Sequence, residues 1–364
     1  MKILWLTNIP SPYRVDFFNE LGKECELTVL FEKTHSSERN DIWKDYRFDN
    51  FKGIFLGGKS IGVAEAMCWS VIKHLKKGKY DHIVVTNYFD FTGMLAVFFM
   101  RIKGMRYSVE GDGAFSGSGK GLKEKIKKFV ISNAVYCFST GKEHDNYYFK
   151  YGAERENIIR YPFTSIKTAD VLCEPLSNNS KKLLKENLGI TENKAVLSVG
   201  QFIHRKGFDT LIHAAANVAH DVGFYFVGGE PTVEYLQLKN NLNLENVHFV
   251  EFKTKADLRD YYLAADIFVH PTRLDIWGLV INEAMACGLP VITTTKCIAG
   301  LEMVRDKRLL VSPDNSEGLS EAINMLLADE DLCNLVSKTN LDVASEYTVE
   351  HMAAEHIDIF NSFD

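Results

Sequence analysis

At 364 residues, the chain is longer than a single hydrophobic core usually supports, so we expect two domains. With 46% hydrophobic and 25% charged residues, its composition is globular and excludes a chain that is disordered throughout. The net charge of -6 is unevenly distributed, because residues 1–165 carry 25 basic and 19 acidic side chains and the remainder carries 17 and 29. An anionic partner is therefore expected to meet the amino-terminal half.

The seven cysteines are scattered, with neither a Cys-x-x-Cys pair nor a His and Cys cluster at zinc-binding spacing. This usage is typical of reduced thiols in a cytoplasmic protein, and no metal constellation is present in the sequence. The apolar start Ile3–Leu6 is too short for a secretory signal. No apolar run approaches the roughly 18 residues that a membrane span needs.

The start of the chain alternates strand and helix in the way that opens a doubly wound α/β domain. We expect a strand at Lys2–Thr7, a turn-rich loop at 8–14, a helix at 15–21 and a second strand at 25–31. A dinucleotide-binding enzyme carries Gly-x-Gly-x-x-Gly after its first strand, whereas this chain has prolines there. The sequence therefore argues against an NAD site.

The first half then repeats the alternation. A polar, irregular stretch at 33–60 comes first. We then expect a helix at 62–77, a strand at 82–86, a helix at 91–100 and a strand at 106–109. The last of these strands delivers Glu110 and Asp112 to a loop that contains glycines. The carboxyl end of a strand is where α/β proteins place ligands. Such residues are equally common in turns, so a catalytic role and a turn role both stay open.

A basic segment, Lys120–Val130, follows a flexible stretch of Ser and Gly. Its apolar side chains share one helical face and lysines surround them: Leu122, Ile126, Phe129 and Val130 against Lys123, Lys125, Lys127 and Lys128. A short basic amphipathic helix can lie on an anionic membrane surface. The alternative is a solvated helix that packs its apolar stripe on its own sheet, and the sequence leaves both open.

A strand at 134–139, a helix at 143–151 and a strand at 158–161 complete the first half. A linker rich in Asp, Ser, Asn and Lys follows, and the second half then restarts the alternation with a helix at 181–188. We expect later strands at 195–199, 224–227, 247–250, 267–270, 291–295 and 309–312, and helices near 208–219, 256–265, 279–285, 316–328 and 348–360. The pattern predicts two Rossmann-like domains, with a cleft lined by the carboxyl ends of both sheets.

The loop Gly200–Gly207 of the second half places Arg205 and Lys206 directly before a helix. At a helix amino terminus, such side chains neutralise a diphosphate or face solvent. His204 lies in the same loop and His270 ends a later strand, and we interpret both as structural.

The stretch 271–292 reads as acidic loop, helix, Gly and Pro stop, and strand, with Asp275 and Glu283 eight positions apart. The two carboxylates are candidates for an acid/base pair, for ligands of sugar hydroxyls, or for a loop cap and a helix ion pair. A helix that begins in this loop aims free N–H groups and its positive end at an anionic ligand.

Together these segments resemble a known family. The pattern from Arg273 to Val291, Arg-x-Asp-x-Trp-Gly-Leu-Val-x-Asn-Glu-Ala-Met-Ala-x-Gly-x-Pro-Val, resembles the signature of the retaining glycosyltransferases of family GT4, the glycosyl transferases group 1. The segment Val199–Gly207 resembles that family's second motif, and Gly228–Pro231 and Gly300–Glu302 lie where the family has similar segments. The resemblance is specific over roughly residues 190–345 and weaker before them. It implies the two-domain GT-B fold.

The resemblance also implies roles for residues of the second half. Glu283 would bind the ribose of a nucleotide-sugar, and Asp275, where the family has Glu, would lie beside the donor sugar with Ile276 and Trp277. The donor diphosphate would be bound by the basic pair and the helix start, namely Arg205, Lys206, Gly278 and Leu279. Gln201 replaces an Arg that is usual in the family.

In the first half the resemblance implies the acceptor side. Where the family often has a His after a central strand, this chain has Glu110-Gly-Asp112, so Glu110 or Asp112 takes the catalytic place of that His. The glycine pair frequent in the first loop is replaced by a proline-rich loop. Asn8, Tyr13 and Arg14 are then the acceptor-side residues.

The implied protein has an acceptor-binding domain at 1–168, a donor-binding domain at 169–345 and a helix at 346–364 that crosses back to the first domain. The implied enzyme is a metal-independent, retaining hexosyl- or N-acetylhexosaminyltransferase without cofactor. It would use a UDP-sugar, or less readily a GDP-sugar, and a glycan or lipid-linked glycan acceptor in bacterial surface polysaccharide synthesis. No nucleic-acid partner is expected. The alternative is a GT-B-like binding or scaffolding subunit whose catalysis has lapsed, suggested by Asp275, Gln201 and the missing His.

Overall fold

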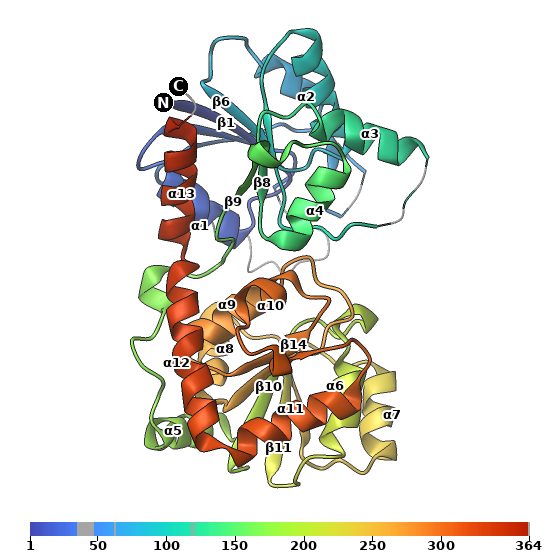
Figure 1. Cartoon of the computed structure of the whole chain (residues 1–364), viewed down its shortest axis with the longest axis vertical. Helices are drawn as coiled ribbons and strands as arrows, with labels where there is room; N and C mark the ends of the chain where they lie inside the picture. Colours follow the sequence, from blue (N-terminus) through green and yellow to red (C-terminus); the bar gives the residue numbers. More distant parts are fainter. Residues whose placement is uncertain (35–46, 62, 118, 120, 363–364) are drawn as a thin grey trace. The chain divides into compact units, whose positions relative to one another are not determined.

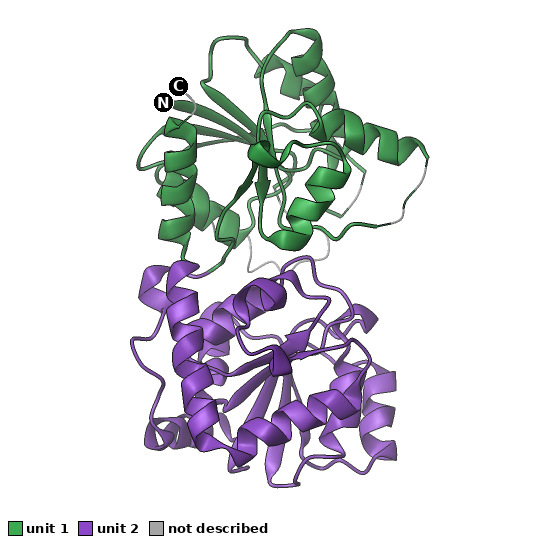
Figure 2. Cartoon of the chain, viewed as in Figure 1, with its two compact units in different colours: residues 1–165, 348–364 green, residues 166–347 purple. Residues whose placement is uncertain are grey.

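The computed structural model describes residues 1–34, 47–61, 63–117, 119 and 121–362. The chain forms two compact units, one of residues 1–165 with 348–364 and one of residues 166–347 (Figure 2). The chain leaves the first unit after Ser165 and returns to it after Tyr347, where we predicted boundaries after residues 168 and 345. We describe each unit by itself.

The described part of unit 1 is built on a seven-stranded sheet in which every pairing is parallel. The strands, in sheet order, are β3 (Lys52–Phe55), β2 (Glu26–Phe31), β1 (Lys2–Thr7), β6 (His82–Val85), β7 (Ser108–Glu110), β8 (Cys137–Ser139) and β9 (Ile158–Arg160). The central strand β1 is buried at five of six positions, as expected for a parallel sheet with helices on both faces.

Helices cover both faces of this sheet (Figure 1). They are α1 (Pro12–Leu21), α2 (Phe91–Ile102), α3 (Leu122–Ile131), α4 (Lys142–Lys150) and α13 (Val349–Asn361). Successive side chains of β1 point to opposite faces of the sheet, as in any strand. Leu4 joins the core beneath α2, α3 and α4. Trp5, on the other face, contacts Phe17 of α1 and Phe360 of α13 at ring-centroid distances of 5.5 and 6.5 Å. The carboxyl-terminal helix is therefore part of the core of unit 1.

Most of the apolar stripe of α3 packs on its own unit. Ile126 and Phe129 pack against the same core as Leu4, and Val130 is fully buried in it. Lys127 also turns inward, where its ammonium lies 3.2 Å from Glu124 and over the ring of Tyr151. Leu122, at the start of the stripe, is instead 73% exposed, so contact with a membrane stays a prediction; Lys120 of this segment lies outside the described residues.

Unit 2 forms a six-stranded parallel sheet within the described residues. Its strands, in sheet order, are β12 (Val247–Val250), β11 (Val222–Val227), β10 (Lys194–Val199), β13 (Ile267–His270), β14 (Val291–Thr294) and β15 (Leu310–Val311). Its helices are α5 (Asn178–Leu188), α6 (Phe208–Ala215), α7 (Val233–Asn241), α8 (Lys255–Ala264), α9 (Leu279–Ala286), α10 (Ile298–Met303), α11 (Ser316–Ala328) and α12 (Glu330–Glu346). The predicted pair of Rossmann-like α/β halves is confirmed.

The helix predicted at 62–77 is wrong. The described part of this segment holds the short strand β5 (Ala66–Met67), paired with β4 (Lys59–Ser60), and the 3-10 helix η2 (Trp69–Lys73). Hydrogen bonds to residues distant in the sequence prevent the helix: Ala66 N–H donates to Glu32 Oε2 at 3.0 Å, and Cys68 N–H donates to Thr92 Oγ1 at 3.0 Å. These distant acceptors take the donors that a helix would use.

The predicted irregular stretch 33–60 also contains more structure than expected, because β3 extends the sheet beside β2. Residues 35–46 of that stretch lie outside the described part. The long helix α12, for which we predicted no element, begins at Glu330 and is capped by Asp329, whose side chain accepts the Leu332 N–H. Across the described chain, no helix is both long and apolar enough to cross a membrane.

Candidate active site

In unit 2, the candidate residues gather where β10 and β13 end. Asp275 Oδ2 lies 2.7 Å from Lys206 Nζ, 3.0 Å from His270 Nε2 and 3.7 Å from Arg205 Nη1. The Asp275 and Lys206 side chains are 11% and 13% exposed, so the pair is largely desolvated. The structure thus brings together the two motifs that the sequence singled out separately.

The backbone explains why Lys206 reaches Asp275. The 3-10 helix η5 (His204–Lys206) ends at Gly207, whose φ of +68° suits glycine. A Cβ at Gly207 would lie 2.2 Å from the Pro271 carbonyl oxygen, so only glycine allows the two loops this close. The Arg205 carbonyl then accepts hydrogen bonds from Arg273 N–H at 2.9 Å and Thr272 Oγ1 at 3.0 Å.

The protonation states of this cluster follow from its partners. Burial opposes ionisation of Asp275, but the hydrogen bond from His270 and the charge of Lys206 outweigh it and hold the pKa of this carboxyl well below its usual range. Burial, together with the charge of Lys206, lowers the pKa of His270. At neutral pH the imidazole is therefore neutral, and its Nε2–H donates to an ionised Asp275. His270, which we interpreted as structural, supports the Asp275 carboxylate.

The helix α9 begins directly after this cluster. Its cap is Gly278 at a φ of +100°, and a Cβ there would lie 2.8 Å from Cys297 Sγ. Leu279, the first helical residue, and Glu283 are four positions apart and share a face of the helix. Free N–H groups at the helix start and a carboxylate one turn later are thus presented side by side.

Glu283 is half-buried and fixed by a neighbouring helix. The hydroxyl of Tyr262, which is buried on α8, donates to Glu283 Oε2 at 2.9 Å. This contact sets the orientation of the carboxylate on α9.

The Trp277 side chain points into unit 2, so a contact of Trp277 with the donor sugar is left to its backbone and stays a prediction. Trp277 is only 2% exposed, its Nε1–H donates to Asn282 Oδ1 at 2.8 Å, and its ring lies 6.1 Å from that of Tyr347. An aromatic ring of this size gains more from burial than from exposure at a polar loop. The neighbouring Ile276 is 46% exposed, so this loop turns Ile276 outward and Trp277 inward.

Unit 1 carries a second cluster, at the carboxyl end of β7. Arg14 Nη1 donates to Glu110 Oε1 at 2.8 Å, and Arg14 also donates to Asp112, which in turn accepts the Tyr13 hydroxyl at 2.8 Å. The Glu110 side chain is fully buried, whereas that of Asp112 is 31% exposed. Burial raises the pKa of Glu110 although Arg14 opposes this shift. Of the two predicted catalytic carboxylates, only Asp112 meets solvent.

The predicted acceptor-side loop is partly helix. The helix α1 begins at Pro12, because proline suits the first helical position, so Tyr13 and Arg14 lie in its first turn. Arg14 is 2% exposed and committed to Glu110 and Asp112, so its side chain supports these two carboxylates, and its place on the acceptor side stays a prediction. Asn8 stays in the loop, where its Oδ1 accepts the Ile9 N–H at 2.8 Å.

His144 joins this second cluster and was missed from the sequence. It lies in the first turn of α4, stacks on Tyr148 with ring centroids 4.3 Å apart, and would approach a Cβ at Gly111 within 3.1 Å. Burial lowers the pKa of His144 to about 3, so the imidazole is neutral. The only signal in the sequence was a His three residues after the Gly that ends a strand. Within the described residues, no group of three potential metal ligands is found.

Comparisons with known proteins agree with this geometry. Residues 180–341 match the family model described as glycosyl transferases group 1, which confirms the resemblance. The lipopolysaccharide glucosyltransferase WaaG of Escherichia coli is 30% identical over 163 residues, which are 42% of this chain and 43% of that protein. The chain thus spans less than half of this relative.

Two further comparisons extend over more of the chain. The N,N'-diacetylbacillosaminyl-diphospho-undecaprenol alpha-1,3-N-acetylgalactosaminyltransferase of Campylobacter jejuni is 24% identical over 280 residues, 74% of this chain and 73% of that one. The crystal structure of Anabaena HepE in complex with UDP superposes with a TM-score of 0.79 at 19% identity and covers all of both chains. At this identity the likeness shows the fold alone.

Proposed function

Residues 180–341 of this chain belong to the glycosyl transferases group 1 family, and from this premise we propose a retaining glycosyltransferase. The enzyme moves a hexosyl or N-acetylhexosaminyl group from a UDP-sugar to a glycan or lipid-linked glycan in surface polysaccharide synthesis. The relatives support this choice of pathway, since WaaG acts on lipopolysaccharide and the Campylobacter enzyme on an undecaprenol diphosphate-linked sugar, as their names state.

The observation that carries the proposal is the cluster of Lys206, Arg205 and Asp275 beside the start of α9. The cluster holds two cations and one carboxylate, so its net charge is one positive charge. The positive end of the α9 dipole lies beside it and adds to the attraction for an anion. A nucleoside diphosphate gains negative charge as the glycosidic bond breaks. Lys206, Arg205 and the N–H of Leu279 stabilise that charge, and no metal ion is required for it.

The remaining residues position the donor. The Glu283 carboxylate, held by Tyr262, accepts hydrogen bonds from the ribose hydroxyls, and Asp275 accepts one from a hydroxyl of the donor sugar. The acceptor hydroxyl attacks from the face that the diphosphate leaves, and the departing phosphate oxygen takes its proton. The anomeric configuration is then retained without a carboxylate nucleophile, in contrast to retaining glycosidases.

On unit 1 we assign contact with the substrate to Asp112 and a positioning role to Glu110. Asp112 is the carboxylate that solvent reaches, and Tyr13 and Arg14 fix both of its oxygens. The Glu110 side chain is fully buried, and its Oε1 accepts a hydrogen bond from Arg14 that holds the guanidinium in place.

The test is the affinity for UDP of Glu283→Ala, measured by calorimetry, and its turnover with a UDP-sugar. Loss of the hydrogen bonds that the ribose hydroxyls donate to this carboxylate costs about 1.5–3 kcal/mol, which is roughly a tenfold to hundredfold rise in Kd. Glu321→Ala, an exposed glutamate on α11, is the matched control and should bind UDP normally. Unchanged UDP affinity and full turnover in Glu283→Ala would refute the assignment.

A thermal-shift panel of UDP, GDP and their sugars identifies the donor, because a bound ligand stabilises the folded state by mass action. We expect UDP to raise the Tm and GDP to raise it less. Nucleotide binding without transfer to any of a broad set of acceptors would instead favour the lapsed, binding-only subunit.

We further propose that unit 1 meets the inner face of the cell membrane through α3 and the end of α2. Ile102, Leu122 and Phe98 are 80%, 73% and 45% exposed, and Phe98 stacks on Phe129 of α3 at 4.8 Å. The exposed lysines of α3 are Lys123, Lys125 and Lys128. Exposed apolar side chains beside lysines suit an anionic bilayer.

Flotation with vesicles that contain anionic lipid tests this contact. Changing Lys123, Lys125 and Lys128 to Glu should abolish flotation, whereas Lys142, Lys150 and Lys167 changed to Glu are a control of equal charge. Flotation that is unaffected by the α3 changes would remove the proposal.

A further inference from the structure

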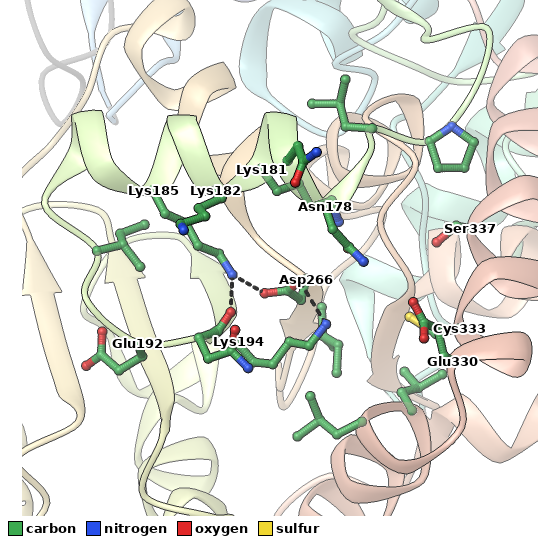
Figure 3. A pocket seen from close by; sticks show the side chains of 18 of the residues that line it. Asn178, Lys181, Lys182, Lys185, Glu192, Lys194, Asp266, Glu330, Cys333 and Ser337 are labelled. Atoms are coloured by element: carbon green, nitrogen blue, oxygen red, sulfur yellow. Dashed lines mark hydrogen bonds and ion pairs between the residues drawn. The ribbon is translucent and has the colours of Figure 1, made fainter.

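A pocket of about 930 Å³ lies at the opposite end of the unit 2 sheet from the candidate active site. It is bounded by α5, α12 and the amino ends of two strands: Lys194 is the first residue of β10, and Asp266 directly precedes β13 (Figure 3). The candidate active site follows the other ends of the same strands, and β10 alone spans roughly 20 Å. The two sites are therefore separate.

Lysines dominate the inner wall of this pocket. Lys185 and Lys194 both point to Asp266, with Nζ–Oδ distances of 2.6 and 3.6 Å (Figure 3). The Asp266 Oδ2 also accepts the Ala195 N–H at 2.8 Å. One carboxylate thus serves two ammonium groups and a backbone donor, so it cannot neutralise the wall.

Lys181 adds a third positive charge. Its Nζ donates to the Ala265 carbonyl at 2.9 Å, and among the described residues no carboxylate lies within 4.0 Å of it. Burial lowers the pKa of Lys181; the charge of Asp266 opposes this shift, and the charges of Lys185 and Lys194 add to it. An ammonium that is half-buried among like charges is stabilised by an anion.

The acidic side chains that line the pocket do not cancel this excess. Glu192 is engaged outside the lysine cluster, since Tyr225 donates to its Oε2 at 2.5 Å and His248 Nε2 lies 2.6 Å from its Oε1. Glu186 and Glu330 are exposed on the rim, as is Lys182.

We propose that this pocket binds a phosphomonoester of a small polar molecule, with the phosphate at Lys181 and Lys194. Its volume lies in the range of pockets that enclose whole metabolites and exceeds the space a free phosphate ion fills. Asn178, Asn334 and Ser337 supply neutral hydrogen-bonding groups around the remaining space, as a sugar moiety requires.

The position of the pocket gives such a ligand a consequence. The helix α5 follows the segment by which the chain enters unit 2 after Ser165, and α12 ends at Glu346, one residue before the chain leaves unit 2. A ligand held by Lys181 on α5 and by Asn334 or Ser337 on α12 joins the helix that follows the entry of the chain into unit 2 to the helix that precedes its exit.

Calorimetric titration at constant ionic strength tests the site, with glucose 6-phosphate, inorganic phosphate and glucose as probes. We expect saturable binding of glucose 6-phosphate, weaker binding of inorganic phosphate and none of glucose. Lys181→Met and Lys194→Met should each weaken glucose 6-phosphate about tenfold or more, since each removes a charged contact. Lys338→Met, an exposed lysine of α12 that does not line the pocket, is the control.

Three results would overturn the proposal: no saturable binding, binding that is insensitive to both lysine changes, or binding that is lost in Lys206→Met, which would place the phosphate in the candidate active site. Equal affinities for inorganic phosphate and glucose 6-phosphate would overturn the assignment of a phosphomonoester. Hydrogen exchange should show protection by glucose 6-phosphate in both α5 and α12, and protection of α5 alone would contradict the bridge. UDP binding in Lys181→Met keeps this test separate from that of the proposed activity.

Discussion

Asp275→Asn removes the one carboxylate that Lys206, Arg205 and His270 share. Breaking a buried ion pair by removing one partner costs about 3–5 kcal/mol. The asparagine amide oxygen still accepts one hydrogen bond, which returns about 1–2 kcal/mol, and the pair is not fully sealed from solvent. We therefore expect the free energy of unfolding of unit 2 to fall by about 2 kcal/mol, or roughly 6 °C in the Tm of a unit of this size.

The assay is urea unfolding followed by circular dichroism at pH 7, with the transition of unit 2 fitted separately, because a chain of two units need not unfold in one step. The pKa of Asp275 is lowered in the folded state, so its stabilisation is fully present above the unfolded value of about 4 and is lost as the pH falls towards the folded pKa. The difference between the two proteins should narrow on acidification.

Asp314→Asn is the matched control for this substitution. Asp314 also accepts from an arginine, Arg273, but its side chain is 60% exposed and its φ is +60°, which asparagine tolerates. A change of less than about 0.5 kcal/mol is expected there. If Asp275→Asn proved as mild as Asp314→Asn, the buried cluster would not contribute to stability in the way argued from its geometry.

Three further predictions follow from other contacts. Burial lowers the pKa of both His144 and His356 to about 3, so below pH 6.5 the unfolded chain binds protons that the folded unit 1 does not. The free energy of unfolding should therefore fall from pH 6.5 towards pH 3, by up to about 2 kcal/mol per histidine at pH 5. His356→Phe should flatten the slope of unfolding free energy against pH. Gly207→Ala should lower both the Tm and the UDP affinity, because the new Cβ would clash with the Pro271 carbonyl oxygen. Gly189→Ala, at a similar φ of +70° with open space around it, should lower the free energy of unfolding by only about 1 kcal/mol. Equal effects of the two substitutions would contradict the close approach of the loops. Asp112→Asn should lower kcat about a hundredfold or more at an unchanged Tm, whereas Glu110→Gln should mainly lower the Tm of unit 1, and the reverse pattern would exchange the roles assigned to them.

Much of the fold could be predicted because most of the described strands are short, largely buried apolar runs. A run such as Ala195–Val199 has no other stable environment than the middle of a covered parallel sheet. The segment around Ala66 could not be predicted, because the N–H groups of Ala66 and Cys68 donate to Glu32 and Thr92, residues 34 and 24 positions away. Local pattern carries no information about such partners.

The site was predictable to a similar degree. Lys206 and Asp275 were singled out on separate loops, and the structure brings their charged groups within 2.7 Å of each other, while the donor roles of Lys206, Asp275 and Glu283 stay predictions. The directions of the Trp277 and Arg14 side chains could not be predicted, because they depend on what packs around them: the indole donates to Asn282 inside the unit, and the guanidinium donates to two carboxylates. His144 was missed because the contact with Gly111 is made only in three dimensions.

The return of α13 to unit 1 has a consequence for synthesis of the protein on the ribosome. Trp5 of the central strand is packed by Phe17 and by His356 and Phe360 of α13, with ring centroids 5.5, 5.8 and 6.5 Å apart. Unit 2 is translated completely before residues 349–361 emerge, so it can close first although it comes second in the chain. We infer that residues 1–165 meanwhile expose an aromatic face that chaperones can bind, until residues 349–361 emerge and cover it.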